Sequence, residues 1–205
     1  IARLGTPAQK ERWLPAVCRG DKILAIAMTE PGGGSDLKAL RTTAVRDGDQ
    51  YVISGSKTFI SNGYLAGLVL VVCSTGPGQR AKGLSILLLE TQSAQGYRVG
   101  RVLDKIGMKA QDTSELFFDD VRVSAQNVLG GQEGQGFSQL MSDLPYERAI
   151  IGVIAVAAME GAYQSTLEYV RDRQAFGQSV AAFQNTRFKL AEIATLIKVA
   201  RTFVD

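Results

Sequence analysis

The 205-residue sequence contains no histidine and only two cysteines, Cys18 and Cys73. Histidine is the commonest metal ligand and the commonest general base, and two distant cysteines cannot form a disulfide framework or a zinc site. We therefore expect no metal centre and no histidine-based catalysis. Any chemistry must use carboxylates, hydroxyl groups, the backbone or a bound cofactor.

Dense basic clusters and long apolar runs are also absent. The 23 basic and 20 acidic residues are spread along the chain and leave a net charge of +3, a pattern that disfavours nucleic acid as a partner. No uninterrupted apolar run reaches the roughly 18 residues of a membrane span, so we expect no integral membrane segment. With 45% hydrophobic and 21% charged residues, the composition is that of an ordinary globular chain with one large or two small cores.

The periodic patterns predict a helix, then a block of strands, then two helices. Thr6, Pro7 and Gln9 form a helix-start signature, Gly20 lies beyond the expected end, and Pro15 is a candidate for an early break. The pattern then changes to a period of two, typical of strands, in six runs: 23–28, 40–45, 50–60, 68–73, 84–90 and 115–123. This block predicts a sandwich or a barrel.

A glycine-rich connector, 130–136, leads from the strands into a long apolar helix. A loop at 172–179 and a final amphipathic helix follow, and this helix reaches residue 205 without a stop signal. Two antiparallel helices rarely bury their apolar faces alone, so we expect partner helices from outside this sequence.

The segment 28–36, MTEPGGGSD, ends a predicted strand with Thr29 and Glu30 and then presents Ser35 and Asp36 after a glycine-rich turn. Several glycines let backbone N–H groups approach a ligand closely, which suits phosphate or a polar heterocycle. The segment lacks the Gly-Lys-Ser/Thr of a Walker A loop and the third glycine of a dinucleotide-binding fingerprint. Taken alone, it predicts a flexible loop more readily than a binding site.

The segment 55–63, GSKTFISNG, has the pattern of a strand that ends in an aromatic residue, a hydroxyl group and an Asn-Gly turn. Alone it predicts an edge hairpin in which Phe59 fills the core. Beside the glycine-rich segment, its residues become candidates for lining a ligand site.

The long helix carries Glu147 on its predicted apolar face, three residues after Leu144 and four before Ile151. We therefore expect the carboxylate to point at the core or into a pocket. One interpretation is a salt bridge or a solvated residue near a bend at Pro145. The other is a general base, because a low-dielectric pocket makes a carboxylate a better proton acceptor. Periodicity favours neither interpretation.

Arg173, Phe176 and Gln184 lie between the two helices and at the start of the second one. An arginine in this place ordinarily pairs with the C-terminal end of a helix. Its guanidinium also matches phosphate oxygens, so a pyrophosphate contact is the alternative.

Together, these segments resemble the acyl-CoA dehydrogenase family. MTEPGGGSD is similar to the family's flavin-site signature, TFISNG (58–63) to its second flavin strand, and RQAFGQ (173–178) followed by Gln184 to its cofactor-contacting loop. All appear in the family's order and at similar spacing. The runs 105–123 and 143–149, with the ending ARTFVD, resemble the long-chain acyl-CoA dehydrogenase branch most.

The resemblance implies an α+β multi-domain fold, with a middle antiparallel β-barrel or sandwich domain followed by part of a C-terminal helical bundle. It assigns 1–22 to the end of an N-terminal helical domain and 23–131 to the middle domain, which binds flavin and acyl-CoA. It assigns 132–205 to the first helices of the bundle. By this likeness the chain looks like a fragment, truncated at both ends, of a protein that assembles as a homotetramer.

The reaction implied is the α,β-dehydrogenation of an acyl-CoA, long-chain by overall likeness, in fatty-acid β-oxidation. In the isovaleryl and long-chain branches the base occupies the position of Glu147, which removes the α-proton while a hydride leaves the β-carbon for the flavin of FAD. The product is trans-2-enoyl-CoA, and the electrons pass to an electron-transfer flavoprotein. Arg148 is a candidate substrate contact. The likeness implies the bacterial cytoplasm or, in a eukaryote, the mitochondrial matrix.

The same likeness assigns the cofactor contacts. Ser35 faces both flavin and CoA, and the residues that line the flavin ring are Met28, Thr29, Gly34, Phe59 and Ser61. Arg173, Phe176 and Gln184 correspond to residues that reach the FAD of a neighbouring subunit, so a monomer should hold FAD weakly. Many relatives have tryptophan in place of Phe59 and threonine in place of Ser61, which alters flavin stacking without excluding it.

Three alternatives stay open. An acyl-CoA oxidase would share the fold and the base but use oxygen as its acceptor. A short-chain or branched-chain, isovaleryl-type dehydrogenase would share the reaction but not the substrate. A non-catalytic paralogue or an inactive fragment would bind no flavin.

Overall fold

The computed structural model describes all residues, 1–205, and the chain divides into two compact units, Ile1–Leu140 and Met141–Asp205. We describe the first as the β unit and the second as the helical unit, each by itself.

The β unit begins with helix α1 (Pro7–Arg19), whose start and end confirm the predicted signals. The Thr6 side chain accepts a hydrogen bond from the Gln9 amide at 3.2 Å, and the Gln9 side chain accepts one from the Thr6 amide at 3.1 Å. Gly20 ends the helix in the left-handed conformation, which glycine adopts without strain. Pro15 lies inside the helix and does not break it early.

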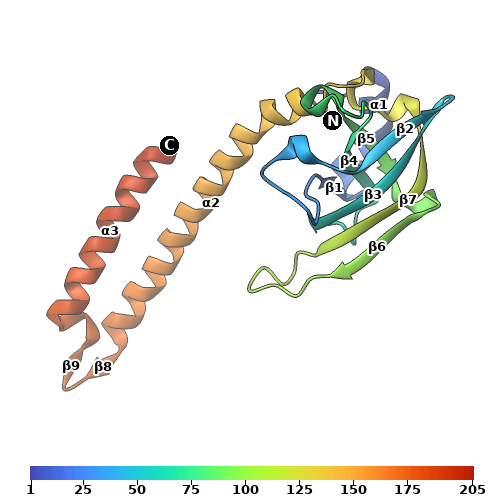
Figure 1. Cartoon of the computed structure of the whole chain (residues 1–205). Coiled ribbons are helices and arrows are strands. Elements are labelled where there is room, and N and C mark those ends of the chain that lie inside the picture. The colour runs from blue at the N-terminus through green and yellow to red at the C-terminus, as the bar shows by residue number, and fades with distance from the viewer. The chain divides into compact units, whose positions relative to one another are not determined.

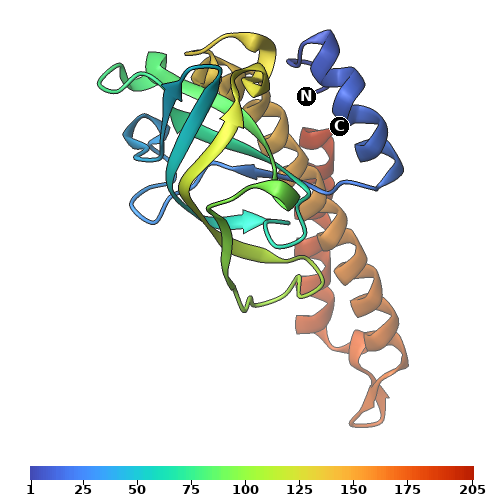
Figure 2. The same ribbon diagram turned by 90° about the vertical axis from the view of Figure 1, so that its right-hand side faces the viewer.

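The predicted β block is confirmed as one curled sheet of seven strands (Figures 1 and 2). The strands are β1 (Leu24–Ala27), β2 (Thr43–Asp47), β3 (Gln50–Ser61), β4 (Leu68–Ser74), β5 (Leu84–Glu90), β6 (Tyr97–Val102) and β7 (Thr113–Ser124). Neighbouring strands are hydrogen-bonded in the order β1-β4-β2-β3-β7-β6. Strand β5 lies off this path and pairs with β4. Most pairings are antiparallel, as expected, but β1 runs parallel to β4, and β2 meets β4 in parallel at one position.

Strand β6 is the one strand of the seven-stranded sheet that the sequence patterns do not reveal. Its residues, YRVGRV, alternate only weakly, and its burial pattern contains no fully buried position. A Cβ at Gly100 would approach the Phe117 ring to 2.5 Å, so β6 lies against β7 through a glycine. Short 3-10 helices complete this unit: η1 (Leu37–Ala39), η2 (Arg80–Gly83), η3 (Thr91–Ser93), η4 (Ala125–Asn127) and η5 (Leu129–Gly131).

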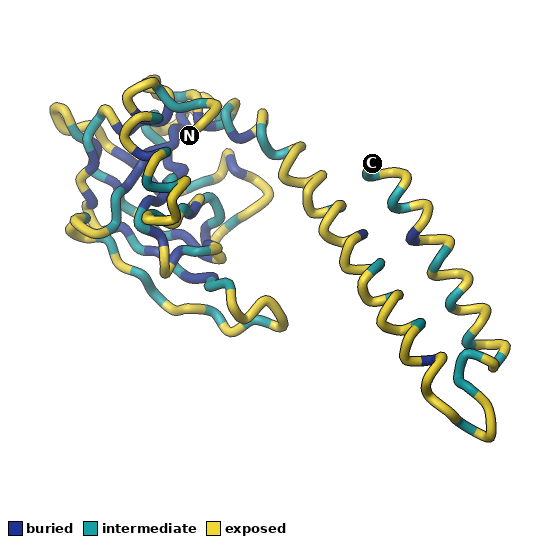
Figure 3. Tube along the Cα trace, turned by 180° about the vertical axis from the view of Figure 1, so that it is seen from behind, coloured by how far each residue is buried: buried dark blue, intermediate teal, exposed yellow.

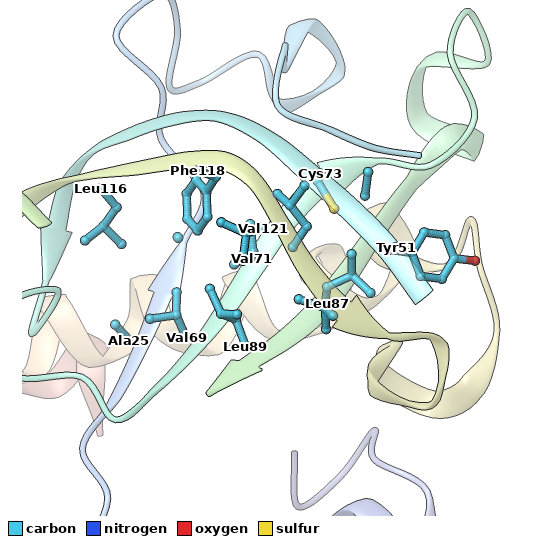
Figure 4. Packing of buried hydrophobic residues seen from close by; sticks show 14 of the residues in the cluster. Ala25, Tyr51, Val69, Val71, Cys73, Leu87, Leu89, Leu116, Phe118 and Val121 are labelled. Atoms are coloured by element: carbon cyan, nitrogen blue, oxygen red, sulfur yellow. The ribbon is translucent and has the colours of Figure 1, made fainter. Parts of the chain in front are cut away.

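The core of the β unit lies on the concave side of the curled sheet, where side chains from several strands meet (Figure 4). Val71 and Leu87 come from the paired strands β4 and β5, and Leu116 and Val121 come from β7. Strands β4 and β5 are nearly continuous apolar runs because they are buried on both faces. The β unit therefore has a complete hydrophobic core of its own.

The helical unit consists of most of helix α2 (Gly136–Asp172), a two-strand hairpin of β8 (Gln174–Ala175) and β9 (Gln178–Ser179), the 3-10 helix η6 (Val180–Ala182) and helix α3 (Gln184–Val204). The predicted loop at 172–179 thus contains a hairpin. Helices α2 and α3 run antiparallel, side by side (Figure 1). A Cβ at Gly152 would lie 3.6 Å from Val204, and Arg201 forms an ion pair with Glu160 at 2.6 Å.

Most of the surface of these two helices is exposed (Figure 3). Only Val156, Val170 and Ile197 are buried in the helical unit, whereas several large apolar side chains are exposed. By length and composition α2 could cross a membrane, although it contains no uninterrupted apolar run of that length. Core helices of soluble proteins also pass this test when they are mostly buried, whereas 6% of the apolar window of α2 is buried in this chain.

Candidate functional site

Two segments that are distant in sequence lie side by side at one place on the β unit. The Thr58 amide donates a hydrogen bond to the Thr29 carbonyl at 2.9 Å, which joins the end of β1 to the end of β3. Glu30 and Gly33 exchange two backbone hydrogen bonds, so the residues after Thr29 form a closed turn and not a flexible loop. A Cβ at Gly33 would meet nothing within 4 Å, so the backbone of this turn is open to a ligand.

Phe59 does not fill the core, and β3 is not an edge strand. Strand β3 lies between β2 and β7, and its register with β7 shifts between Lys57 and Ile60, which marks a bulge. Phe59 adopts a left-handed backbone conformation, φ 58°, and its side chain is 66% exposed. A bulky residue in that conformation is strained, and such strain is concentrated at functional sites. The bulge redirects Phe59 from the interior to the surface.

Beneath this surface lies an ion pair that the sequence patterns did not reveal. Lys57 is fully buried, and its ammonium group is 2.9 Å from the Glu30 carboxylate, of which only 7% is exposed. Lys57 also donates to the Met28 carbonyl at 3.0 Å. Glu30 accepts further hydrogen bonds from the backbone amides of Arg41 at 2.7 Å and Thr42 at 2.9 Å.

The two partners stabilise each other as charged groups. Burial by itself would raise the pKa of Glu30, but hydrogen bonds from Thr42, Arg41 and Lys57 hold that pKa below its usual value. Burial lowers the pKa of Lys57, and the neighbouring Glu30 carboxylate partly offsets this effect. A signal for the pair was present in the sequence, since Lys57 has the same parity in β3 as the inward-facing Tyr51 and Ile53.

Six of the residues predicted to contact the cofactor gather in these two segments: Met28, Thr29, Gly34, Ser35, Phe59 and Ser61. Gly34 lies against the Thr29 side chain, since a Cβ there would be 3.6 Å from its methyl group. The site combines an exposed aromatic ring, the hydroxyl groups of Thr29 and Ser61 and an open glycine turn. This combination suits a flat, polar heterocycle.

Glu147 and Arg148, on α2 in the helical unit, are both exposed. Within the helical unit Glu147 therefore does not point into a core, and its place in a pocket stays a prediction. Helix α3 packs against Gly152, Val156 and Glu160, which lie about 140° to 180° around α2 from Glu147 at 3.6 residues per turn.

The face of α2 that carries Glu147 is nevertheless apolar. Ile151 and Ile154 lie on the same side of the helix within about 40° of Glu147, and their side chains are 65% and 62% exposed. Glu147 thus lies on an exposed, largely apolar surface, which we call the Glu147 face.

Arg173, Phe176 and Gln184 gather at the far end of α2. The Arg173 amide donates to the Tyr169 carbonyl at 2.9 Å, and Arg173 is followed by the β8–β9 hairpin. Phe176 and Gly177 form its two-residue turn, both with positive φ, and Phe176 is 97% exposed. Gln184 begins α3 and is exposed. The turn therefore displays an aromatic ring in a conformation that glycine or asparagine ordinarily occupies.

The two predicted groups on the helical unit are far apart. Glu147 and the end of α2 at Asp172 are separated by 25 residues of helix, or about 38 Å at 1.5 Å per residue. Glu147 and Phe176 of one chain therefore do not contact the same ring of one ligand.

Family models account for most of the chain. Residues 25–121 match the model described as "Acyl-CoA dehydrogenase, middle domain", and residues 134–205 match "Acyl-CoA dehydrogenase, C-terminal domain". The second match covers all of α2 and all of α3.

Individual relatives agree with the family models. The chain is 49% identical to the mitochondrial long-chain specific acyl-CoA dehydrogenase of Mus musculus over its full length, and it spans 48% of that protein. It is 38% identical to the acryloyl-CoA reductase (NADH) of Anaerotignum propionicum and spans 52% of it. A crystal structure of an acyl-CoA dehydrogenase from Geobacillus kaustophilus superposes with a TM-score of 0.96 at 49% identity, covering all of this chain and 54% of that one.

Proposed function

This chain belongs to the acyl-CoA dehydrogenase family, and we propose that the protein dehydrogenates acyl-CoA thioesters at the α and β carbons. Members of this family use FAD as their cofactor. The likeness to the mouse long-chain specific enzyme supports a long-chain substrate. We further propose a role in fatty-acid β-oxidation, with an electron-transfer flavoprotein as the acceptor. The proposal covers the whole protein, because the chain spans about half the length of the curated relatives it matches.

The observation that carries the proposal is the pairing of the 28–35 turn with the Phe59 bulge. Phe59 offers an aromatic surface next to the hydroxyl groups of Thr29 and Ser61, and Met28 and Gly34 complete the surroundings. Bound here, FAD supplies a hydride acceptor that no amino-acid side chain provides. Ser35 follows the turn and is exposed, so its hydroxyl group is available to the cofactor and to the CoA portion of the substrate.

Glu147 is the proposed general base. A carboxylate is an effective base where water is excluded, and the Glu147 face becomes such a place once protein or an acyl chain covers Ile151 and Ile154. In this proposal Glu147 takes the proton from the α-carbon, and Arg148 helps to hold the substrate. The apolar side chains around Glu147 orient the acyl chain and keep water from the α-carbon.

We place Arg173, Phe176 and Gln184 at the cofactor of a neighbouring copy. The length of α2 separates them from Glu147, and the ring of Phe176 is exposed at the hairpin tip. Cofactor sites shared between copies fit a homotetramer. The uncovered apolar surfaces of α2 and α3 support the same assembly, because further helices would bury them. A mitochondrial matrix or bacterial cytoplasmic location follows the same likeness.

A visible spectrum of the full-length protein tests cofactor and base together. Adding a saturated long-chain acyl-CoA without oxygen should bleach the flavin band of the parent protein. In Glu147→Gln we expect bleaching to slow by roughly 10²- to 10⁴-fold, the usual contribution of a general base. Glu168→Gln, which removes an exposed carboxylate from the same helix, is the matched control and should bleach at the parental rate.

The other outcomes separate the alternatives. Undiminished bleaching in Glu147→Gln would move the base to another residue. Rapid reoxidation in air without a protein acceptor would identify an oxidase, and faster bleaching with isovaleryl-CoA would identify a branched-chain enzyme. A parent protein without a flavin band would be a non-catalytic relative.

A further inference from the structure

The buried pair of Lys57 and Glu30 takes no part in the proposed chemistry, yet it lies directly beneath the residues that would hold the flavin. Buried ion pairs stabilise proteins poorly, since apolar replacements of similar volume are often as stable. The value of this pair is therefore to be sought in the geometry that it imposes.

The pair ties together three separate segments of the β unit. Lys57 belongs to β3 and reaches the Met28 carbonyl at the end of β1. Glu30 begins the glycine turn, and its carboxylate accepts hydrogen bonds from the backbone amides of Arg41 and Thr42, which precede β2. Each charged group thus has partners on segments other than its own, so neither segment can shift without breaking charge-assisted hydrogen bonds.

The pair also sits where both flavin-facing segments leave regular structure. Lys57 is the last residue of β3 before the register shift that precedes Ile60, and Glu30 is the first residue of the closed turn. Between them runs the hydrogen bond from the Thr58 amide to the Thr29 carbonyl. The strained backbone of Phe59 follows immediately, and strain of this kind persists only where the surroundings hold it.

We propose that Lys57 and Glu30 are positioning residues that lock the 28–35 turn to the Phe59 bulge and thereby preorganise the flavin site. This inference rests on the proposed function. Neither residue touches the reacting atoms; both act through Met28, Thr58 and Phe59.

The test compares two double variants of the full-length protein. Lys57→Met with Glu30→Gln removes both buried charges together, which leaves no unpaired charge and keeps the fold. Lys22→Met with Glu90→Gln is the matched control, because it removes a partly exposed ion pair of 3.0 Å from the same unit, together with the ion pair between Arg12 and Glu90. The measurements are the FAD dissociation constant, the shape of the bound flavin spectrum, and hydrogen exchange of the Thr58 amide in the flavin-free protein.

In the Lys57/Glu30 variant we expect FAD to bind on the order of tenfold more weakly. This is the change in binding free energy that the loss of one ordinary hydrogen bond produces. The flavin band should lose its fine structure, and the Thr58 amide should exchange faster while the amides of β4 and β5 stay protected. The control should match the parent in all three measurements.

The inference is overturned if the Lys57/Glu30 variant keeps the parental FAD affinity, flavin spectrum and Thr58 protection. It is also overturned if the variant only melts at a lower temperature, because the pair would then support the fold alone. A parent protein that binds no FAD would refute the proposed function instead, so the two failures are distinguishable.

Discussion

The β unit and the helical unit differ in how they use apolar residues. In the β unit, strands β4 and β5 are nearly continuous apolar runs and are almost fully buried. In the helical unit, α2 and α3 are also rich in apolar residues, yet large side chains such as Ile154, Leu196 and Phe203 are more than half exposed. Apolar residues thus form a buried core in the β unit and a solvent-exposed surface in the helical unit.

This difference identifies what each unit can do by itself. A curled sheet closes around its own core, so the β unit buries its apolar side chains against one another. A pair of helices buries only the stripe where the two touch, so the rest of its apolar surface requires other protein. Stability of the β unit should be intrinsic, whereas that of the helical unit should depend on its surroundings.

Deleting the same side chain from each unit tests the contrast most strongly. Leu88→Ala removes a fully buried side chain from β5, and we expect it to lower the free energy of unfolding of the β unit by about 2 to 5 kcal/mol. Leu196→Ala removes a side chain from α3 that is 61% exposed, and we expect a change within about 0.5 kcal/mol in the 205-residue chain. Urea denaturation followed by circular dichroism measures both.

A large decrease in the free energy of unfolding of Leu196→Ala that grows with protein concentration would change this interpretation. It would mean that copies of the 205-residue chain already cover α3 in solution. If Leu88→Ala lowers the free energy of unfolding no more than Leu196→Ala does, the distinction between the two units is contradicted.

The start of α1 offers a smaller test within the β unit. Thr6→Ala removes the capping hydroxyl group and should destabilise α1 by about 1 kcal/mol, because the Gln9 amide loses its acceptor. The effect should reach the segment after β7, since the Gln9 side chain also donates to the carbonyls of Gln126 and Val128. Trp13, the only tryptophan, is buried in α1, so its fluorescence reports this transition.

Thr195→Ala is the matched control for the cap. The Thr195 hydroxyl group donates to the Ala191 carbonyl within α3, a mid-helix position where alanine is the better helix former. We expect this variant to be neutral or slightly stabilising. A Thr6→Ala variant that behaves like Thr195→Ala would show that the cap contributes nothing to α1.

Sequence patterns predicted the elements of this fold well where short-range chemistry decides them. The cap at Thr6, the end at Gly20 and six of the seven strands follow from capping, turn and alternation rules. Strand β6 was not predicted because its apolar and polar residues alternate only weakly and its place depends on pairing with β7. The parallel pairing of β1 with β4 likewise depends on contacts between segments distant in sequence.

The candidate site was predictable in its residues but not in its orientation. Alternation places Phe59 inside, and only the bulge before Ile60 turns it outward. Glu147 was placed on an apolar stripe, and that stripe is real, but α3 packs on the opposite face. Period alone cannot say which of two apolar faces of one helix meets a given neighbour. Alternation in β3 could have shown that Lys57 faces inward, but its pairing with Glu30 becomes visible only when β3 and the 28–35 turn are brought together.

The smallest expected effect concerns the ion pair that joins the two helices of the helical unit. The hydrogen bond from Arg201 lowers the pKa of Glu160 below its ordinary value of 4.5. A carboxylate with a lowered folded-state pKa contributes stability that is fully present above its unfolded-state pKa and is lost as the pH falls through the lowered value. Both side chains are partly exposed, so the contribution is modest and sensitive to salt.

Thermal melts of the helical signal between pH 7 and pH 2 measure this contribution. At pH 7 the parent should melt slightly above Glu160→Gln, and the difference should vanish at acid pH, where Glu160 is protonated and releases Arg201. Glu168→Gln removes a carboxylate from the same helix that bonds Gln164 and no arginine, so it should show no such pH-dependent difference. A constant gap between parent and Glu160→Gln across the whole range would mean that the Glu160 side chain supports α2 and α3 by packing and not by its charge.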